Sequence, residues 1–310
     1  MAILTRKDTK KRRIASVGMM DGVHAGHRFL LDFLRAEGEQ LHLSPAVVTF
    51  SDHPLTTVNP QRAPQLLTTP EQKLQMLQES VAEDVIVLNF NHRMSRMSAS
   101  KFLEMLHGKW GIDALVVGFN NRFGRDRAEG IEAYRVIGDK IGMKIIEAPE
   151  VTADNGMKVS SSAIRQCIRG GEMEQAAVML THPYTLRGNV VHGQALGREI
   201  GFPTANITPE SERLLVPTGG VYAAWVVTPD GVRNPAMVNI GVRPTVSGDN
   251  PNPTIEAHII DYTGYLYDEA VSVEFVTRLR DEKKFKSVDA LVKQLHKDEK
   301  QVRKILRRCN

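Results

Sequence analysis

Up to about residue 180, short apolar runs alternate with stretches in which apolar residues recur every three or four positions. The runs are rich in β-branched residues and apolar at consecutive positions, which is typical of strands covered on both faces. They read RIASVG from residue 13, PAVVTF from 45, DVIVLNF from 84, ALVVGF from 114 and MKIIEAP from 143. This alternation predicts a parallel sheet with helices on both faces, of the Rossmann-like α/β class.

Two of the intervening helices have clear start signals. Thr69 and Pro70 form a cap followed by a first-turn proline, and Leu74 and Leu77 then repeat at helical spacing. Ser98 caps a second run whose apolar residues share one face. Functional groups in such folds gather at the carboxyl ends of the strands, so those ends are the first place to look for chemistry.

Beyond residue 183 the pattern changes to closely spaced strands with frequent glycine and proline. The strand-like segments are TLRGNVVHG, VYAAWVVTP, PAMVNIG, TIEAHIID and VSVEFVTRL. In the fourth, Ile255 and Ala257 alternate with Glu256 and His258, which predicts opposite faces. We expect a small antiparallel β-barrel, followed by a helix from about Ser287 to the C-terminus. The predicted domains are therefore residues 1–182 and 183–310.

Composition narrows the function classes. Apolar residues make up 42% of the 310 residues and charged residues 25%, as in globular proteins. The net charge of +4 suits phosphorylated small molecules as well as nucleic acid. Aromatic residues reach only 6%, which disfavours nucleic-acid binding by the basic runs RKDTKKRR and KDEKQVRKILRR.

Two further features concern location. Cys167 and Cys309 are far apart and lack zinc-type spacing, which indicates a reducing, cytoplasmic setting. No apolar run approaches the roughly 18 residues of a membrane span, so we expect no membrane partner. Self-association is left open.

The segment GMMDGVHAGH follows the first predicted strand and precedes a helix. Gly18, Gly22 and Gly26 permit a tight turn close to a ligand, and His24 and His27 are spaced to project from one side of the helix start. A helix N-terminus with adjacent imidazoles suits a pyrophosphate. A metal pair or two surface histidines are the alternatives, and a metal would need further ligands that have no obvious source.

Three later segments also end strands in polar groups. They supply His53, then Asn120 with Arg122, then three serines with an arginine, namely Ser160, Ser161, Ser162 and Arg165. Hydroxyls at a helix start beside an arginine can bind an anion, although ordinary capping explains serines equally well. We expect these groups to converge on one edge of the sheet.

The segment GQALGREIGFPTAN carries the chemistry of the second half. Gly193, Gly197 and Gly201 recur every four residues where backbone must approach a ligand. After Pro203, the oxygen atoms of Thr204 and Asn206 suit a Mg²⁺ ion that bridges ATP phosphates, although a plain glycine–proline turn would look the same. Glu256 is a candidate base for a hydroxyl, and a solvated edge residue is its alternative.

Taken in order, the motifs from Ile14 to Leu306 resemble those of the prokaryotic bifunctional riboflavin kinase/FAD synthetase family. GMMDGVHAGH, VVTFSDHP, VVGFNNRFGRDR and VSSSAIR resemble its adenylyltransferase module. GFPTAN, GGVYAAWV, NIGVRPTV, IEAHIIDYTGYLY and LRDEKKF resemble its kinase module. The resemblance implies a cytoplasmic enzyme that phosphorylates riboflavin to FMN with ATP and Mg²⁺, and then adenylylates FMN to FAD.

The resemblance also implies roles for individual residues. Glu256, His24 and His27 would be catalytic, Thr204 and Asn206 would bind the metal, and Arg280 with Asn239 would bind flavin. ATP and phosphate would be held by Gly18, Asp21, Gly26, His53, Asn120, Arg122, Ser160, Ser161, Ser162, Arg165, Gly193, Gly197, Gly201 and Pro203.

The chain departs from the family pattern at three positions of the first half. Met20, Asp52 and Asn121 stand where the family commonly has phenylalanine, proline and phenylalanine. One alternative is therefore a riboflavin kinase whose first half keeps only a binding or regulatory role.

Overall fold

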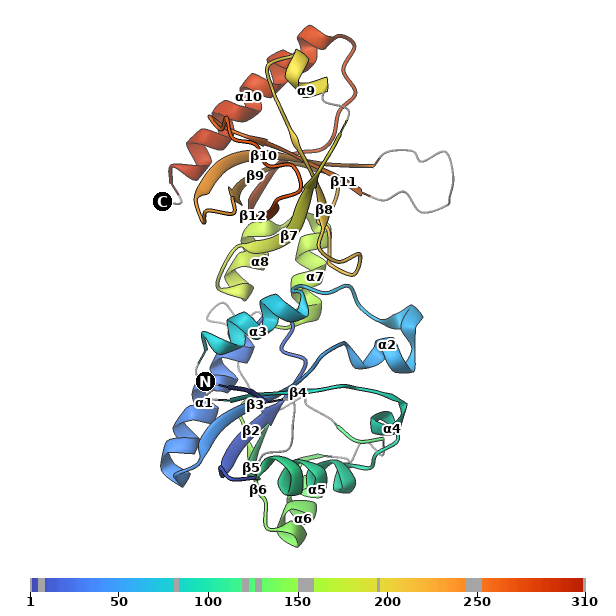
Figure 1. Cartoon of the computed structure of the whole chain (residues 1–310), viewed down its shortest axis with the longest axis vertical. Helices are drawn as coiled ribbons and strands as arrows, with labels where there is room; N and C mark the ends of the chain where they lie inside the picture. The colour runs from blue at the N-terminus through green and yellow to red at the C-terminus, as the bar shows by residue number, and fades with distance from the viewer. Residues whose placement is uncertain are drawn as a thin grey trace. The chain divides into compact units, whose positions relative to one another are not determined.

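The structure is a computed structural model, and it describes residues 2–4, 9–80, 84–118, 123–125, 130–149, 159–193, 196–242 and 253–308. The chain forms two compact units, shown in Figure 1. The first comprises Met1–Gln65 and Pro70–Ser160, and the second comprises Leu66–Thr69 and Ser161–Asn310.

The first unit is built on a parallel six-stranded sheet in the order β1-β4-β3-β2-β5-β6. Its strands are β1 (Ala2–Leu4), β2 (Arg13–Val17), β3 (Ser44–Phe50), β4 (Asp84–Leu88), β5 (Ile112–Val117) and β6 (Lys144–Glu147). The five predicted runs are confirmed as β2 to β6. The chain crosses from one side of β2 to the other between β4 and β5, which makes the carboxyl end of β2 a topological switch point.

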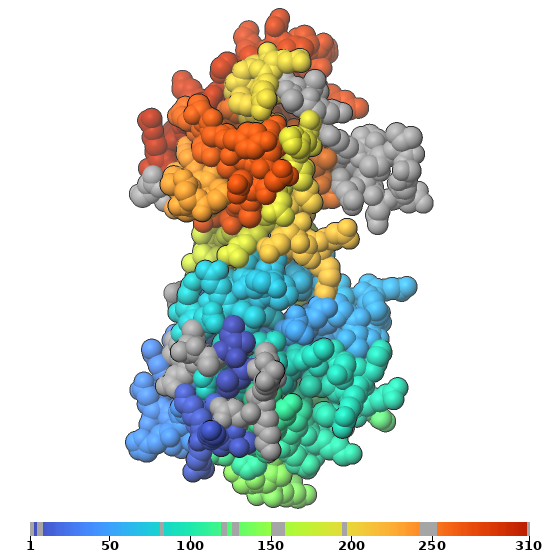
Figure 2. Space-filling view, viewed as in Figure 1, coloured from blue at the N-terminus to red at the C-terminus, as the bar shows by residue number. Residues whose placement is uncertain are grey.

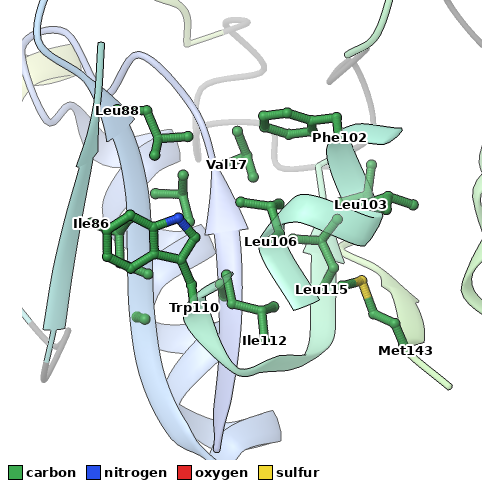
Figure 3. Packing of buried hydrophobic residues seen from close by; sticks show 14 of the residues in the cluster. Val17, Ile86, Leu88, Phe102, Leu103, Leu106, Trp110, Ile112, Leu115 and Met143 are labelled. Carbon is green, nitrogen blue, oxygen red and sulfur yellow. The ribbon is translucent and has the colours of Figure 1, made fainter. Parts of the chain in front are cut away.

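Helices cover both faces of this sheet, as the sequence predicts. They are α1 (Ala25–Leu41), α2 (Pro54–Val58), α3 (Pro70–Gln78), α4 (His92–Ser95), α5 (Ala99–Trp110) and α6 (Gly130–Ile141), with a 3₁₀ turn at Pro60–Arg62. On one face, Phe102, Leu106 and Trp110 of α5 meet Val17 and Ile86 of the strands in a dry cluster (Figure 3). A second cluster lies under α1 and α3.

The second unit is a closed barrel with the strand order β10-β11-β8-β7-β12-β9 and antiparallel pairing. Its strands are β7 (Tyr184–Val191), β8 (Ala205–Pro209), β9 (Gly220–Val227), β10 (Arg233–Val242), β11 (Pro253–Ile259) and β12 (Ala270–Arg280). Its helices are α7 (Ser161–Gly170), α8 (Met173–Leu180), α9 (Leu196–Glu199) and α10 (Val288–Leu306). The antiparallel barrel and its C-terminal helix are both confirmed.

Two packing features of the second unit matter for the chemistry. Ser287 is the N-cap of helix α10 and its hydroxyl accepts from the Ala290 N–H, while the apolar stripe of the helix packs on the outer surface of the barrel. The short segment around α9 (yellow) lies beside the first part of α10 (red) in the space-filling view (Figure 2). A space between the barrel wall and these two helices results.

The compact units divide earlier in the sequence than the predicted domains do. Helix α8 packs on β7 and β12, so it and α7 count with the barrel. Leu66 also joins the barrel unit, because its N–H donates to the Arg213 carbonyl at 2.7 Å. These contacts do not test which residues each activity needs, so the functional boundary at 182/183 stays a prediction. None of the described helices is both long and apolar enough to cross a membrane.

Candidate active sites

The loop after β2 is held in an unusual backbone conformation. Met20, Gly22 and Val23 have φ of 53°, 78° and 38°, all in the left-handed region. That region is unfavourable for a β-branched residue such as Val23, and strain of this kind persists only where the surroundings impose it. Here Met20 and Val23 are buried in the core beneath α1, which fixes the loop.

This loop delivers His24 as the N-cap of α1. His24 is 6% exposed, and its Nδ1 accepts a long hydrogen bond of 3.4 Å from the His27 N–H. When Nδ1 accepts, the neutral ring carries its proton on Nε2. The His24 and His27 rings stack with centroids 3.7 Å apart, so the predicted projection from one side is confirmed.

His27 is poised as an uncharged group. Its Nδ1 is buried, and the described residues give that atom no hydrogen-bond partner. Burial lowers the pKa of His27 well below 6.5, and the charges of His24 and Lys73 lower it further. At neutral pH the ring is therefore a neutral imidazole with one buried, unsatisfied nitrogen.

The neighbouring strand β3 is also followed by a histidine at a helix N-cap. His53 caps α2, and its Nδ1 accepts from the Leu55 N–H at 3.1 Å. Asp52 accepts from the His53 N–H at 2.7 Å and from the Thr56 hydroxyl at 3.2 Å. Because β2 and β3 are adjacent and parallel, both imidazoles lie at the carboxyl edge of the sheet, as the sequence predicts.

Sequence reasoning missed Lys73 of α3. This residue is only 4% exposed, and its Nζ donates to the Phe50 carbonyl at the end of β3 at 2.7 Å. Burial lowers its pKa to about 8, against the opposing effect of Asp21 and Asp52. A signal was present, because Lys73 precedes the core residue Leu77 by four positions and so shares the buried face of its helix.

The remaining predicted groups of the first half divide into two sets. Asn120 and Arg122 lie outside the described residues. Ser161, Ser162 and Arg165 lie in the first turns of α7, directly after Ser160. The structure does not test whether they meet the histidines, although the preceding segment does approach this loop: a Cβ on Gly26 would lie 3.9 Å from the Val159 carbonyl oxygen.

In the second unit, the barrel register aligns the predicted kinase residues. Glu256 on β11 pairs directly with Asn206 on β8 and with Asn239 on β10. Asn239 pairs in turn with Val221 on β9, and Val221 pairs with Arg280 on β12. Residues directly opposite one another point to the same side of a sheet, so five successive strands each contribute one side chain to a single row.

Four residues of this row, Val221, Asn239, Glu256 and Arg280, border a cavity of about 350 Å³ between the barrel, α9 and α10. That volume is within the range of small-molecule sites. Glu256 and His258 line it while Ile255 lies in the barrel core, which confirms the predicted alternation of this strand. The lining residues are Gly197, Ile200, Phe202, Thr204, Val221, Met237, Asn239, Glu256, His258, Arg280, Glu282, Lys283, Phe285, Leu291 and Leu295.

Arg280 is held rigidly at this cavity. Its Nε and Nη2 lie 2.9 Å and 2.7 Å from Oδ2 of Asp298, a carboxylate of α10 that is almost fully buried. Gln294 donates to the other oxygen of Asp298 at 2.7 Å. The guanidinium carbon also lies 5.9 Å from the ring centre of Phe285, which completes the support of this side chain.

The glycine-rich segment folds against the same wall. A Cβ on Gly197 would lie 2.2 Å from the Phe202 carbonyl oxygen, and a Cβ on Gly193 would lie 2.1 Å from Asn206 Nδ2. Both positions therefore need glycine for close approach. Gly201 has φ of 81°, the left-handed conformation that glycine adopts readily. His258 Nδ1 donates to the Pro203 carbonyl at 2.8 Å, which ties the segment to β11.

Thr204 also borders a second, smaller cavity of about 100 Å³. Its lining includes three tyrosines and Arg198. Tyr267 also stacks on His192, with 4.1 Å between ring centres, and Arg198 Nη2 lies 3.4 Å from the Tyr267 hydroxyl. Such groups suit a base and its phosphates. Thr204 is thus shared by two cavities.

The donors around Thr204 fit a hard cation. The threonine hydroxyl, the Asn206 amide oxygen and the Glu256 carboxylate are all oxygen ligands, the type that Mg²⁺ prefers. The absence of a Cβ on Gly193 lets the Asn206 amide pack directly against the Gly193 backbone. Within the described parts of the chain, no cluster of three or more His, Cys, Asp and Glu side chains could hold a metal.

Comparison with known proteins agrees with the division of the chain into two units. A family model described as FAD synthetase matches residues 6–163, and one described as riboflavin kinase matches residues 180–306. A bifunctional riboflavin kinase/FMN adenylyltransferase of Pseudomonas fluorescens is 35% identical over 286 residues, covering 92% of this chain and 90% of its own length. The protein of the same description from Bacillus subtilis is 31% identical, with 95% of this chain and 93% of its own length covered.

A solved structure is similar over the whole length as well. It is a crystal structure from Streptococcus pneumoniae described as a macrolide-efflux protein, with a TM-score of 0.87 and 30% sequence identity. The match covers 97% of this chain and 98% of that one. Both compact units therefore have counterparts in one known chain.

Proposed function

The chain belongs to the family of bifunctional riboflavin kinase/FMN adenylyltransferases, and we propose that its two units perform the two reactions separately. It is an enzyme with both activities, which convert riboflavin to FMN and FMN to FAD. The alternative of a kinase with a merely regulatory first half is not supported, because the FAD synthetase match spans residues 6–163.

The kinase reaction is assigned to the barrel unit. The observation that carries this proposal is that Thr204 lines both cavities, so a donor in one and an acceptor in the other would meet at its hydroxyl. ATP would occupy the aromatic, basic cavity beside Tyr267 and Arg198. Riboflavin would occupy the larger cavity, beside Asn239 and Arg280.

Glu256 is the proposed acceptor of the proton from the riboflavin 5′-hydroxyl. As that oxygen bonds to the γ-phosphorus of ATP, the bond from the γ-phosphorus to the bridging oxygen breaks and its electron pair leaves with ADP. Thr204 and Asn206 are the proposed Mg²⁺ ligands. When bound, the ion would neutralise charge on the phosphate oxygens.

Adenylyl transfer is assigned to the edge of the first sheet. A phosphate oxygen of FMN bonds to the α-phosphorus of ATP, and the bond to the β-phosphate oxygen breaks with its electron pair leaving in pyrophosphate. Support comes from the His24 and His27 rings at the N-terminus of α1, where backbone N–H groups also favour an anion. No covalent enzyme intermediate is needed, because alignment and charge stabilisation suffice.

Two further proposals concern the boundary between the functional domains and the location of the enzyme in the cell. The functional boundary lies at residues 182/183, which the start of the riboflavin kinase match at residue 180 supports. The enzyme works in the cytoplasm, which the wide separation of Cys167 and Cys309 in the sequence, without zinc-type spacing, supports.

Two substitutions test the division of labour. Glu256→Gln should abolish FMN formation from riboflavin and leave adenylylation of supplied FMN intact, whereas His27→Ala should do the reverse. Chromatographic separation of riboflavin, FMN and FAD over time measures both reactions in one sample. Equal damage to both reactions in both variants, with folding preserved, would refute separate sites.

A further inference from the structure

Lys73 occupies an unusual position for a lysine. Its side chain lies beneath the carboxyl edge of the sheet with only 4% of the residue exposed. The one hydrogen bond that the described residues give its ammonium goes to the Phe50 carbonyl, at 2.7 Å. An ammonium has three N–H donors, and buried donors are normally satisfied by protein, water or ligand.

Nearby carboxylates favour the charged form of Lys73 without a direct contact to its ammonium. Asp21, in the loop after β2, and Asp52, in the loop after β3, both favour the ammonium form through space. His27 on α1 also interacts with Lys73: burial is the main cause that lowers the pKa of His27, and the charges of His24 and Lys73 lower it further. The Lys73 cation and the neutral His27 imidazole are therefore both buried near the carboxyl edge of the sheet.

His27 supplies an independent sign of a missing partner. Its Nδ1 is buried with no hydrogen-bond partner among the described residues. Lys73, whose ammonium lies at the end of β3, and His27, on the helix that follows the adjacent strand β2, thus both have unused hydrogen-bonding capacity near neighbouring strand ends. An anion with several oxygen atoms would satisfy both groups, and it would also relieve the cost of burying the ammonium.

We propose that Lys73 is a further catalytic residue of adenylyl transfer, whose ammonium hydrogen-bonds the departing pyrophosphate together with His27. This inference rests on the proposed assignment of adenylyl transfer to the first unit. As the bond between the α-phosphorus and the β-phosphate oxygen breaks, negative charge collects on pyrophosphate. A fixed positive charge at that place stabilises the transition state more than the ground state.

The direct test compares Lys73→Met, Lys73→Arg and the exposed Lys101→Met on α5 as the matched control. The full chain is titrated with magnesium pyrophosphate by calorimetry, and adenylylation of FMN is measured alongside. Lys73→Met should weaken pyrophosphate binding and lower kcat by roughly ten- to hundredfold each, the range for a lost charged hydrogen bond. Lys73→Arg should recover most of both, and Lys101→Met should match the unaltered protein.

Riboflavin kinase activity in the same samples reports on folding of the second unit, and a thermal melt reports on the first. If Lys73→Met does not fold, the pH profile decides. Because only the protonated lysine binds phosphate, kcat/KM for adenylylation should fall as the pH rises through about 8 in the unaltered protein. In Lys73→Arg that decline should be absent up to about pH 10.

The outcomes separate this inference from the function on which it rests. If His27→Ala leaves adenylylation intact, the assignment of the reaction to this edge is wrong. If His27→Ala abolishes it while Lys73→Met binds pyrophosphate normally, Lys73 has only a structural role under the end of β3. A pH profile that is the same in Lys73→Arg and in the unaltered protein overturns the proposal in the same way.

Discussion

Replacement of Gly193 by alanine tests whether the position of the Asn206 amide controls the kinase reaction. The new Cβ would lie 2.1 Å from Nδ2 of Asn206, 2.5 Å from its Cγ and 2.9 Å from its Oδ1. Ordinary contacts of a Cβ begin near 3.4 Å, so the amide must move by about 1.3 Å. Gly193 does not have a left-handed φ, so alanine itself fits the backbone.

The size of this displacement sets the expected loss. A shift of about 1 Å in a group that positions a reacting phosphate costs roughly 10²-fold in rate, or about 2.7 kcal/mol of transition-state stabilisation. We therefore expect kcat/KM for riboflavin phosphorylation to fall about a hundredfold in Gly193→Ala. Adenylylation of supplied FMN should be unchanged, because it takes place in the other unit.

Steady-state assays with chromatographic detection of FMN and FAD measure both activities. Gly219→Ala is the matched control, because its Cβ would meet nothing closer than the Ile240 carbonyl oxygen at 3.5 Å. A double-mutant cycle with Asn206→Ala isolates the mechanism: once the amide is gone, the second substitution should cost little. An undiminished effect of Gly193→Ala in the Asn206→Ala background, or full activity of Gly193→Ala alone, would refute the reasoning.

Two further predictions concern Asp298 and His27. Asp298→Asn removes the charged partner of Arg280, so the KM for riboflavin should rise about tenfold or more while kcat changes little. Steady-state kinetics measure both constants. Glu299→Gln is the control, because the Glu299 carboxylate pairs with Arg303 instead. An unchanged KM would mean that Arg280 does not contact flavin. Because burial holds the pKa of His27 below 6.5, the unfolded chain binds a proton before the folded chain does as the pH falls below that value. Stability of the first unit should therefore decrease below about pH 6.5, and denaturant unfolding of His27→Gln should show a smaller decrease.

The sequence by itself determined most of the elements and indicated where the candidate site residues lie along the chain. Strands β2 to β5 are mostly buried on both faces and therefore visible as continuous apolar runs, whereas the edge strand β6 is only partly buried. The motif around His24 directly follows β2. The hydroxyl cap of Ser98, confirmed by its hydrogen bond from the Lys101 N–H at 3.3 Å, is a local interaction that needs no distant partner. Strands β1 and β8 were not predicted, because short strands are defined by their pairing rather than by their own pattern.

Only the tertiary structure decided which of these groups meet. Alternation along β11 places Glu256 on one face, but the row that joins it to Asn206, Asn239 and Arg280 depends on the register of five strands, and a shift of one residue would turn each side chain to the other face. Lys73 illustrates the same limit. A lysine on an amphipathic helix is ordinarily solvated, and its burial beside Phe50 follows from how α3 packs on the sheet. Local sequence sets periodicity and caps, whereas burial and register come from contacts between segments far apart in the chain.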